Sequence, residues 1–276
     1  MMSDPLLAVV RLVLLALWTL ILLPPFLLMK TLRFDMSGFK RLYWQGVCRL
    51  AGIAVTVRGQ LAPGRSVLFA SNHASYLDVP VLGARLPAVF AAKGDIAHWP
   101  VIGFIARLGD TQFVQRKQSQ ARNFALSLGY RLKRGSSVVF FPEATSSDGL
   151  RVLPFRPAGF EAAMRRPGTL VQPVSVVCTQ LNGMPIYRSW RPHFSWYGDM
   201  ELGPHLWAFL GFGRTQVDLV LHPPVLAQDF ADRTQLAAHC ERASAQGVAR
   251  LLAGAGAGET AAGAVQDVPC LVELAI

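Results

Sequence analysis

One histidine and one aspartate in this chain stand at a spacing that suits proton transfer. His73 and Asp78 belong to the stretch 72–78 (NHASYLD), which follows an apolar run. Both would lie where a strand ends, and ligand crevices of α/β sheets form there. Histidine, with an unperturbed pKa of about 6.5, suits proton abstraction near neutral pH, and a carboxylate bound to its other ring nitrogen orients the ring. The pair is a candidate general base; the alternative is a loop histidine and a helix-capping aspartate.

Two further stretches could bind a substrate. The stretch 140–149 (FFPEATSSDG) is an apolar run that ends in Pro142, Glu143 and small polar residues, a suitable pocket floor. The alternative there is an ordinary turn with an exposed glutamate. The stretch 109–116 (GDTQFVQR) ends in Arg116, whose guanidinium could clamp an anionic headgroup with two hydrogen bonds. By itself, an arginine at such a place is more often a solvated surface residue.

Alternating strands and helices should position these residues. Runs of β-branched and aromatic residues predict strands at 55–57, 67–71, 89–92, 112–114, 138–141, 170–177 and 217–221. Helical spacing predicts helices at 79–86, 100–108, 120–134 and 228–252. The alternation is typical of an α/β domain with a mixed sheet flanked by helices. We expect this domain at 55–228, after N-terminal membrane-anchor and interfacial helices at 1–54 and before a C-terminal helix at 229–252 and a low-complexity tail at 253–276.

An apolar run near the N-terminus predicts where the protein works. Residues 12–29 carry no charge, and a helix of this length is just long enough to span a bilayer. Pro24 and Pro25 should break or kink that helix. A signal peptide is the alternative, but the run lacks a basic start and a small-residue cleavage site. The flank that follows is basic, which predicts an inner-membrane anchor with the rest of the chain facing the cytoplasm. Residues 37–50 suit either an interfacial helix or a core-packing one.

Composition excludes several classes of protein. The 276 residues are 52% hydrophobic and only 16% charged, which excludes intrinsic disorder for most of the chain. The four cysteines are scattered, so a disulfide scaffold or a cysteine-based zinc site is a poor interpretation. The net charge of 27 − 17 = +10 indicates an anionic partner. Because the cations are spread along the chain rather than gathered in a stripe, we expect a membrane surface and not nucleic acid.

The order of these motifs resembles that of the bacterial 1-acylglycerol-3-phosphate acyltransferases. HxxxxD at 73–78, GxxxFVxR at 109–116, FPExT at 141–145 and a proline-bearing apolar strand at 171–174 follow one another as in that family, across about residues 55–225. The resemblance implies a glycerolipid acyltransferase-like fold and acyl transfer from acyl-CoA or acyl carrier protein to a lysolipid hydroxyl, most simply 1-acyl-sn-glycerol-3-phosphate to give phosphatidic acid. It implies His73 as general base and Asp78 as its orienter. It also implies an acceptor site made of Asn72, Arg116, Phe141, Pro142, Glu143, Ala144 and Thr145, with no metal or cofactor.

The third motif departs from the family pattern at two positions. The family usually reads FPEGTR, and this chain has Ala144 and Ser146 in place of the glycine and the arginine. Because alanine does not easily take a positive φ, we expect either a position that is not left-handed or a reshaped loop. Without the arginine, the site lacks a guanidinium group that can bind two phosphate oxygens. Lys93, Arg116 and Arg151 could still neutralise the charge of a phosphate. The stretch 145–155 resembles the lyso-ornithine lipid acyltransferases, so ornithine lipid synthesis is the second expectation.

Three alternatives remain from the sequence. A Ser–His nucleophile at Ser75 is one, but no GxSxG elbow presents a serine. A catalytically silent lipid-surface protein is another, and the presence of both His73 and Asp78 weighs against it. A membrane-tethered hydrolase is the third, and paired carboxylates for it are missing. His193 and His205 lie in a stretch without metal-ligand spacing, so we expect packing and turn roles for them.

Overall fold

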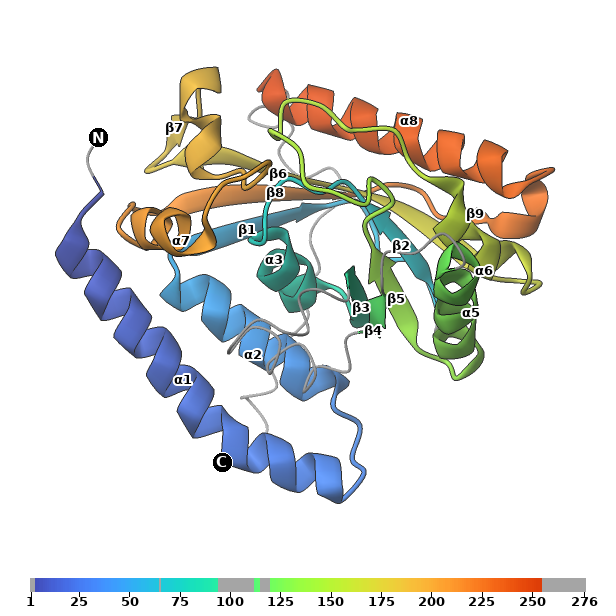
Figure 1. The fold of residues 1–276 in the computed structure, drawn as a ribbon, viewed down its shortest axis with the longest axis horizontal. Coiled ribbons are helices and arrows are strands. Elements are labelled where there is room, and N and C mark those ends of the chain that lie inside the picture. Colours follow the sequence, from blue (N-terminus) through green and yellow to red (C-terminus); the bar gives the residue numbers. More distant parts are fainter. Residues whose placement is uncertain (1–2, 65, 94–111, 115–119, 255–276) are drawn as a thin grey trace.

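Nine strands form one mixed sheet in the computed structural model of the chain, which describes residues 3–64, 66–93, 112–114 and 120–254 (Figure 1). The strands are β1 (Ile53–Arg58), β2 (Leu68–Ser71), β3 (Ala88–Lys93), β4 (Gln112–Val114), β5 (Ser137–Phe140), β6 (Leu170–Leu181), β7 (Met184–Pro185), β8 (Thr215–Leu221) and β9 (Val225–Leu226). Their order is β1-β8-β6-β2-β5-β3-β4, with β7 and β9 also paired to β6. Only the pairs that β6 makes with β7, β8 and β9 are antiparallel among these strands. The predicted mixed α/β sheet is confirmed.

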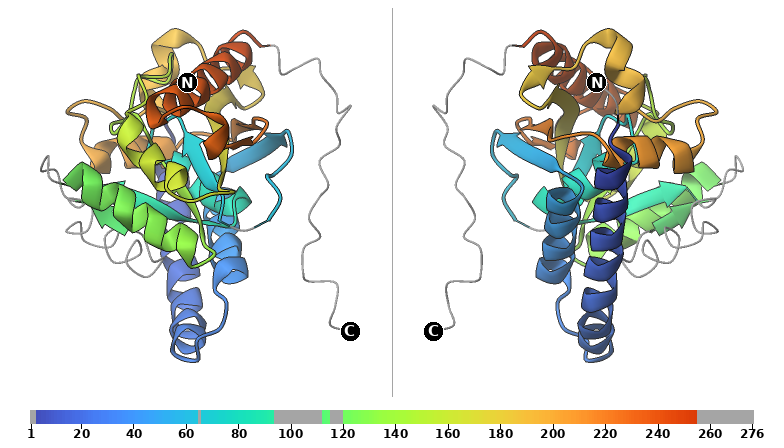
Figure 2. Two further views of the ribbon diagram at one scale, coloured as in Figure 1. Left: turned by 90° about the vertical axis from the view of Figure 1, so that its right-hand side faces the viewer. Right: turned by 90° about the vertical axis from the view of Figure 1, so that its left-hand side faces the viewer.

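Helices cover both faces of this sheet (Figures 1 and 2). They are α1 (Pro5–Thr31), α2 (Ser37–Leu50), α3 (Asp78–Arg85), α5 (Gln120–Lys133), α6 (Glu161–Met164), α7 (Leu202–Leu210) and α8 (Arg233–Leu252), with 3₁₀ turns η2 (Pro157–Phe160), η3 (Arg188–His193) and η4 (Ala227–Asp229). Alternate residues of one strand serve opposite faces: Phe69 joins the core beneath α2, α3 and α7, whereas Leu68 and Ala70 join the core beneath α5 and α8.

Some predicted elements differ from those observed. The helix expected at 228–252 begins only at Arg233, because Asp232 caps it by accepting from the N–H groups of Thr234 and Gln235. Helix α7 was not predicted, since the glycine and proline near its start read as loop residues. The helix expected at 100–108 lies outside the described residues. The domain boundaries stay predictions.

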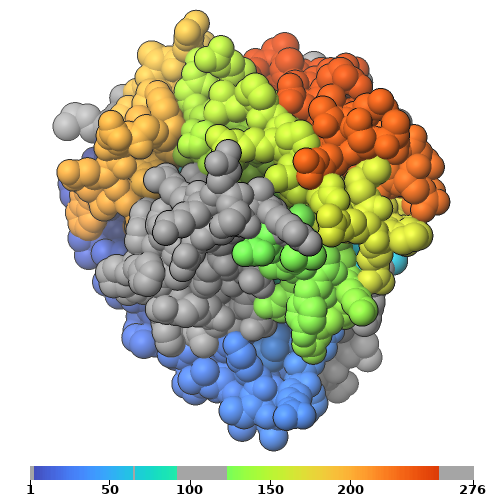
Figure 3. Space-filling view, turned by 45° about the vertical axis from the view of Figure 1, so that its right-hand side comes forward, coloured from blue at the N-terminus to red at the C-terminus, as the bar shows by residue number. Residues whose placement is uncertain are grey.

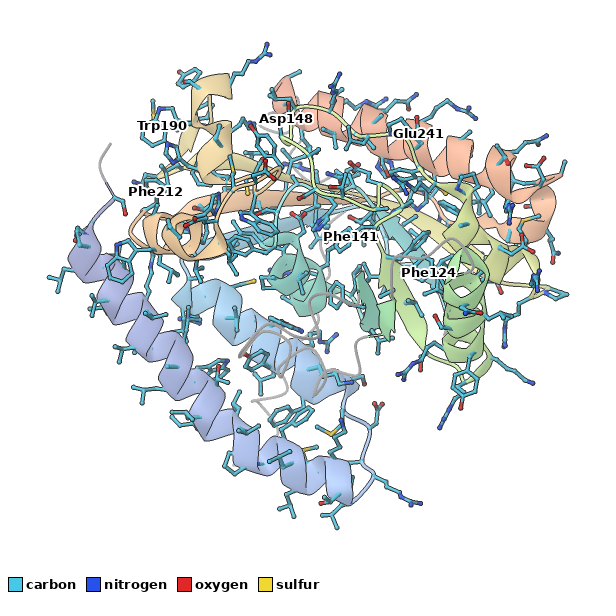
Figure 4. All side chains as sticks on the ribbon, viewed as in Figure 1. Phe124, Phe141, Asp148, Trp190, Phe212 and Glu241 are labelled. Atoms are coloured by element: carbon cyan, nitrogen blue, oxygen red, sulfur yellow. The ribbon has the colours of Figure 1, made fainter. Side chains whose placement is uncertain are left out.

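The apolar N-terminal run forms one continuous helix. Helix α1 continues through Pro24 and Pro25 to Thr31, so the expected break at the prolines is not found. It is long and apolar enough to cross a membrane, with a mean hydropathy of 2.7, and most of its side chains point away from the protein (Figure 4). Helix α2 runs back along it. Gly46 lets the two helices approach closely, because a Cβ there would overlap the Trp18 ring.

The beginning of α1 is fastened to the α/β domain. The Asp4 N–H donates to Gly211 O (2.9 Å), just past the end of α7. Arg11, the charge within the apolar region, donates through Nη1 to the carbonyls of Leu210 (3.1 Å) and Phe212 (2.5 Å). Carbonyl oxygens at a helix C-terminus are acceptors that lack intrahelical partners and favour a cation. Arg11 therefore ties the anchor helix to the end of α7.

Candidate active site

His73 and Asp78 meet directly after β2, at the beginning of α3. His73 Nδ1 lies 2.8 Å from Asp78 Oδ2, and the same oxygen accepts from the N–H groups of Ala74 (2.8 Å) and Ser75 (2.9 Å). Three donors on one oxygen fix the carboxylate, as does its place in the first turn of α3. With Nδ1 facing a carboxylate, the ring proton sits on Nδ1, and Nε2 keeps its lone pair. The predicted closeness of the two side chains is confirmed.

The loop after β5 holds His73 from two sides. The Phe141 ring stacks on the imidazole with centroids 3.9 Å apart (Phe141 is labelled in Figure 4). The His73 N–H donates to Glu143 Oε1 (2.9 Å), and the His73 carbonyl accepts from the Ser147 N–H (2.9 Å). The side chain of His73 is still 21% exposed, so a substrate can reach its ring. The imidazole is thus held in one orientation at an accessible position.

Asn72 and Glu143 bind backbone groups in the structure, and their expected contacts with substrate stay a prediction. The Asn72 amide is buried: its Oδ1 accepts from Val176 N–H (2.7 Å) and its Nδ2 donates to Val176 O (3.0 Å). Glu143 is also buried, and its second oxygen accepts from the Leu153 N–H (3.1 Å). Both side chains therefore bind backbone and position the turn that carries His73. The sequence showed their types but not the backbone groups opposite them.

The other predicted acceptor residues lie along the same loop. Pro142 is buried, Phe141 and Ala144 are half-buried, and Thr145 is exposed. Arg116 lies outside the described residues, so its predicted role stays a prediction. Figure 3 shows the surface of the loop segment between the η3–α7 region and α8. Among the described residues, no cluster of three or more His, Cys, Asp or Glu side chains is placed to hold a metal ion.

The stretch around residues 193–207 contacts the turn that carries His73. The sequence did not predict these contacts. The Trp196 N–H donates to Ala74 O (2.8 Å), and Ser195 Oγ donates to Asp148 O (3.0 Å). His205 bonds the Tyr76 hydroxyl through Nδ1 (2.9 Å). The expected packing role of His205 agrees with these contacts, and the aromatic composition of the stretch was the available signal.

Ala144 adopts a left-handed backbone, with φ +58°. The first alternative, that this position is not left-handed, is therefore wrong, and the second, a reshaped loop, stays a prediction. A left-handed alanine costs about 1–2 kcal/mol, which exceeds the entropy lost on ordering a glycine, about 0.5–1 kcal/mol. Ala144→Gly should therefore raise the free energy of unfolding by about 0.5–1 kcal/mol, seen as a higher melting temperature. Ala163→Gly in helix α6 should lower it; equal shifts in both variants would contradict the argument.

Burial raises the pKa of Glu143 to about 7, although the N–H groups of His73 and Leu153 oppose the shift. Between its ordinary value of 4.5 and about 7, the folded protein keeps a proton that the unfolded chain has lost. Stability should therefore fall as pH rises through this window, by at most about 1.4 kcal/mol per pH unit. Melting temperatures in neutral detergent from pH 4.5 to 8 measure this decline, which Glu143→Gln should remove.

The control for this prediction is Glu161→Gln. Hydrogen bonding to Arg165 lowers the pKa of Glu161, so its contribution has the opposite sign and its removal leaves the Glu143 decline in place. A Glu143→Gln protein that declines with pH as steeply as the wild type would show that another group carries the effect.

Comparison with known proteins shows the family of this chain. A family model described as Acyltransferase matches residues 53–177. The lyso-ornithine lipid O-acyltransferase of Brucella abortus is 38% identical over 212 residues, which cover 73% of this chain and 79% of that protein. The chain belongs to the acyltransferase family. The 1-acyl-sn-glycerol-3-phosphate acyltransferase of Neisseria meningitidis is 33% identical to this acyltransferase, over 63% of the chain and 66% of the relative.

A solved structure has the same fold. The crystal structure of the 1-acyl-sn-glycerophosphate acyltransferase of Thermotoga maritima superposes on this acyltransferase with a TM-score of 0.65, covering 89% of this chain and 95% of that one at 20% identity. The predicted resemblance is therefore confirmed, and the protein is an enzyme that transfers acyl groups to a lysolipid. Its N-terminal apolar helix associates it with a membrane.

Proposed function

We propose that His73 is the general base of this acyl transfer and that Asp78 orients it. His73 Nε2 takes the proton from the lysolipid hydroxyl while that oxygen attacks the thioester carbonyl carbon of acyl-CoA or acyl carrier protein. The tetrahedral intermediate collapses, the carbon–sulfur bond breaks, and the leaving thiolate takes the proton back from the imidazolium. The observation that carries this proposal is the 2.8 Å contact of Nδ1 with Asp78, which leaves Nε2 as the accessible base.

The alternative nucleophile, Ser75, has little support. Ser75 is only 1% exposed, and its N–H, not its hydroxyl, meets Asp78. A serine nucleophile needs its oxygen beside the base and open to the acyl donor. Direct attack by the acceptor hydroxyl therefore fits the geometry better than an acyl-enzyme.

For the acceptor we favour lyso-ornithine lipid over 1-acyl-sn-glycerol-3-phosphate, which reverses the ranking expected from the motifs. Relatives named lyso-ornithine lipid O-acyltransferase from Brucella abortus and Rhizobium meliloti are 38% and 37% identical to this chain. Ser146 stands where the family usually has an arginine that could bind a phosphate. An ornithine headgroup has no phosphate, so it does not need that arginine.

An acyl-transfer assay with both acceptors tests this choice. Membranes containing the wild type should acylate lyso-ornithine lipid faster than 1-acyl-sn-glycerol-3-phosphate. Ser146→Arg should shift the ratio toward the phosphate acceptor, whereas Ser136→Arg, a matched half-buried serine before β5, should not. A wild type that prefers the phosphate acceptor would return the assignment to phosphatidic acid synthesis.

We further propose that the enzyme inserts from the cytoplasmic face of the inner membrane without crossing it. The first residues of α1 bind the end of α7, and α2 leads back to β1, so both ends of the α1–α2 hairpin lie on the domain side. Lys30 and Arg33, near the hairpin tip, would then reach toward headgroups by snorkelling. A cysteine introduced at Ser3 should be labelled by an impermeant maleimide only after the inner membrane is opened; labelling of intact spheroplasts would indicate a spanning helix.

A further inference from the structure

A second cavity lies at the β1 edge of the sheet, away from His73. Its volume is about 630 Å³, and it is formed by the C-terminal half of α2, the edge strand β1, the end of α3 and the start of β8. Neither His73 nor Asp78 lines it. We call it the arginine pocket, after the three basic side chains that line it: Arg49, Arg85 and Arg214.

The charge of the arginine pocket has one sign. None of its described lining residues is acidic, and none of its three arginines takes part in the ion pairs of the described residues. Arg11 adds a fourth guanidinium at one end, since it contacts Gly52 in the pocket wall. Like charges gathered in a concave site repel one another and raise the local concentration of anions. An anion in the pocket would relieve this repulsion.

The pocket also offers hydrogen-bond donors in a fixed arrangement. Arg85 Nη2 donates to Val55 O (3.0 Å), which holds the guanidinium over the outer edge of β1. Because the N–H and C=O of one strand residue point to the same side, the Val55 N–H also faces outward, away from β8. Forked guanidinium groups beside backbone N–H groups match the oxygens of a phosphate.

The strand register shows how the arginine pocket sits relative to the active site. Ser71 of β2 pairs with Val174 of β6, and Val55 of β1 stands in the row of Cys178, four residues further along β6. The pocket thus lies at the end of the sheet where β2 delivers His73. It is three strands away, at about 4.8 Å per strand. A group bound there would be separated from His73 by these three strand spacings.

We propose that the arginine pocket binds a phosphate-bearing anion, which is a second ligand site in addition to the acyl-transfer site. The phosphate would belong either to a soluble molecule or to an anionic lipid headgroup beside α2, and the chemistry of recognition is the same for both. The proposal does not depend on which lysolipid the enzyme acylates.

Binding by the full-length protein in neutral detergent tests the proposal. The pocket variant is Arg49→Gln/Arg214→Gln, two exposed arginines, which leaves the Arg85 bond to β1 intact. The control is Arg242→Gln/Arg250→Gln, two exposed arginines on α8 that give the same change in net charge. One arm titrates adenosine 3′,5′-bisphosphate; the other measures flotation with phosphatidylcholine vesicles that contain or lack phosphatidylglycerol.

We expect the pocket variant to lose about tenfold or more in affinity in one arm, as two lost cation contacts predict, and the control variant to lose little. Loss for the bisphosphate identifies a soluble ligand, and loss only for phosphatidylglycerol vesicles identifies a lipid headgroup. Unchanged binding in both arms, or equal losses in pocket and control variants, would overturn the proposal. Melting temperatures near the wild-type value confirm that both variants are folded.

Discussion

Replacing His73 by alanine is expected to lower kcat by about 10²–10⁴ while leaving the protein folded. The imidazole makes one side-chain hydrogen bond, to Asp78, and its ring stacks on Phe141, so the fold loses little when it is removed. In the proposed mechanism the ring acts on the reacting hydroxyl and does not hold the rest of the acceptor, so the KM for lysolipid should change far less than kcat. Steady-state acyl transfer in mixed micelles, at saturating thioester, measures both constants.

The matched control is His239→Ala, a half-buried histidine on α8 that packs near Phe230. It should retain the wild-type rate. A His73→Ala enzyme that keeps its full rate would show that the acceptor hydroxyl loses its proton to another group, and the proposed mechanism would then be wrong.

Replacing Asp78 by asparagine should cost a comparable factor, about 10²–10⁴ in kcat, for a different reason. An asparagine oxygen can still accept the N–H groups of Ala74 and Ser75. Because Oδ2 is also the oxygen that faces His73 Nδ1, the asparagine oxygen at that place would keep all three contacts, but it carries no negative charge. The ring would remain in place without the carboxylate that stabilises the imidazolium formed when Nε2 takes the proton.

Asp232→Asn is the control for this substitution. Asp232 also accepts two backbone N–H groups at a helix start, on α8, and asparagine caps helices equally well. It should leave the rate and the melting temperature unchanged. If Asp78→Asn loses activity only in proportion to lost folded protein, Asp78 is a helix cap and not the orienter of His73.

The sequence predicted the strands well and their arrangement only as a class. Runs of β-branched and aromatic residues located β2, β5 and β6 to within a few residues, because these strands are mostly apolar and largely buried on both faces. Nothing in these runs indicates that β8 inserts between β1 and β6, since that order requires β8 to pair both with nearby β6 and with β1, whose residues are more than 150 positions away. Helix α7 was not predicted because its Gly203 and Pro204 are residues that usually interrupt helices. A proline is tolerated in the first turn of a helix, and Pro204 lies there.

Around His73, the sequence predicted which side chains gather but not the backbone groups to which some of them bind. His73 and Asp78 were identifiable because a short turn must bring them together. The amide of Asn72 and the carboxylate of Glu143 have backbone partners at Val176 and Leu153, which the sequence did not indicate. Such partners depend on the final packing of distant segments, and every residue has the same backbone groups, so composition carries no signal for them.

The contacts around His73 also imply an order of events during synthesis. The loop that carries Phe141 and Glu143 is held further along by Glu241, which accepts from the Phe155 N–H (2.8 Å; Glu241 is labelled in Figure 4). A ribosome adding about 5–20 residues per second needs roughly 10–40 s to travel from the end of the apolar helix to that glutamate. The nascent chain can thus reach the lipid phase well before its catalytic turn is complete, so it first becomes competent where its substrate already is.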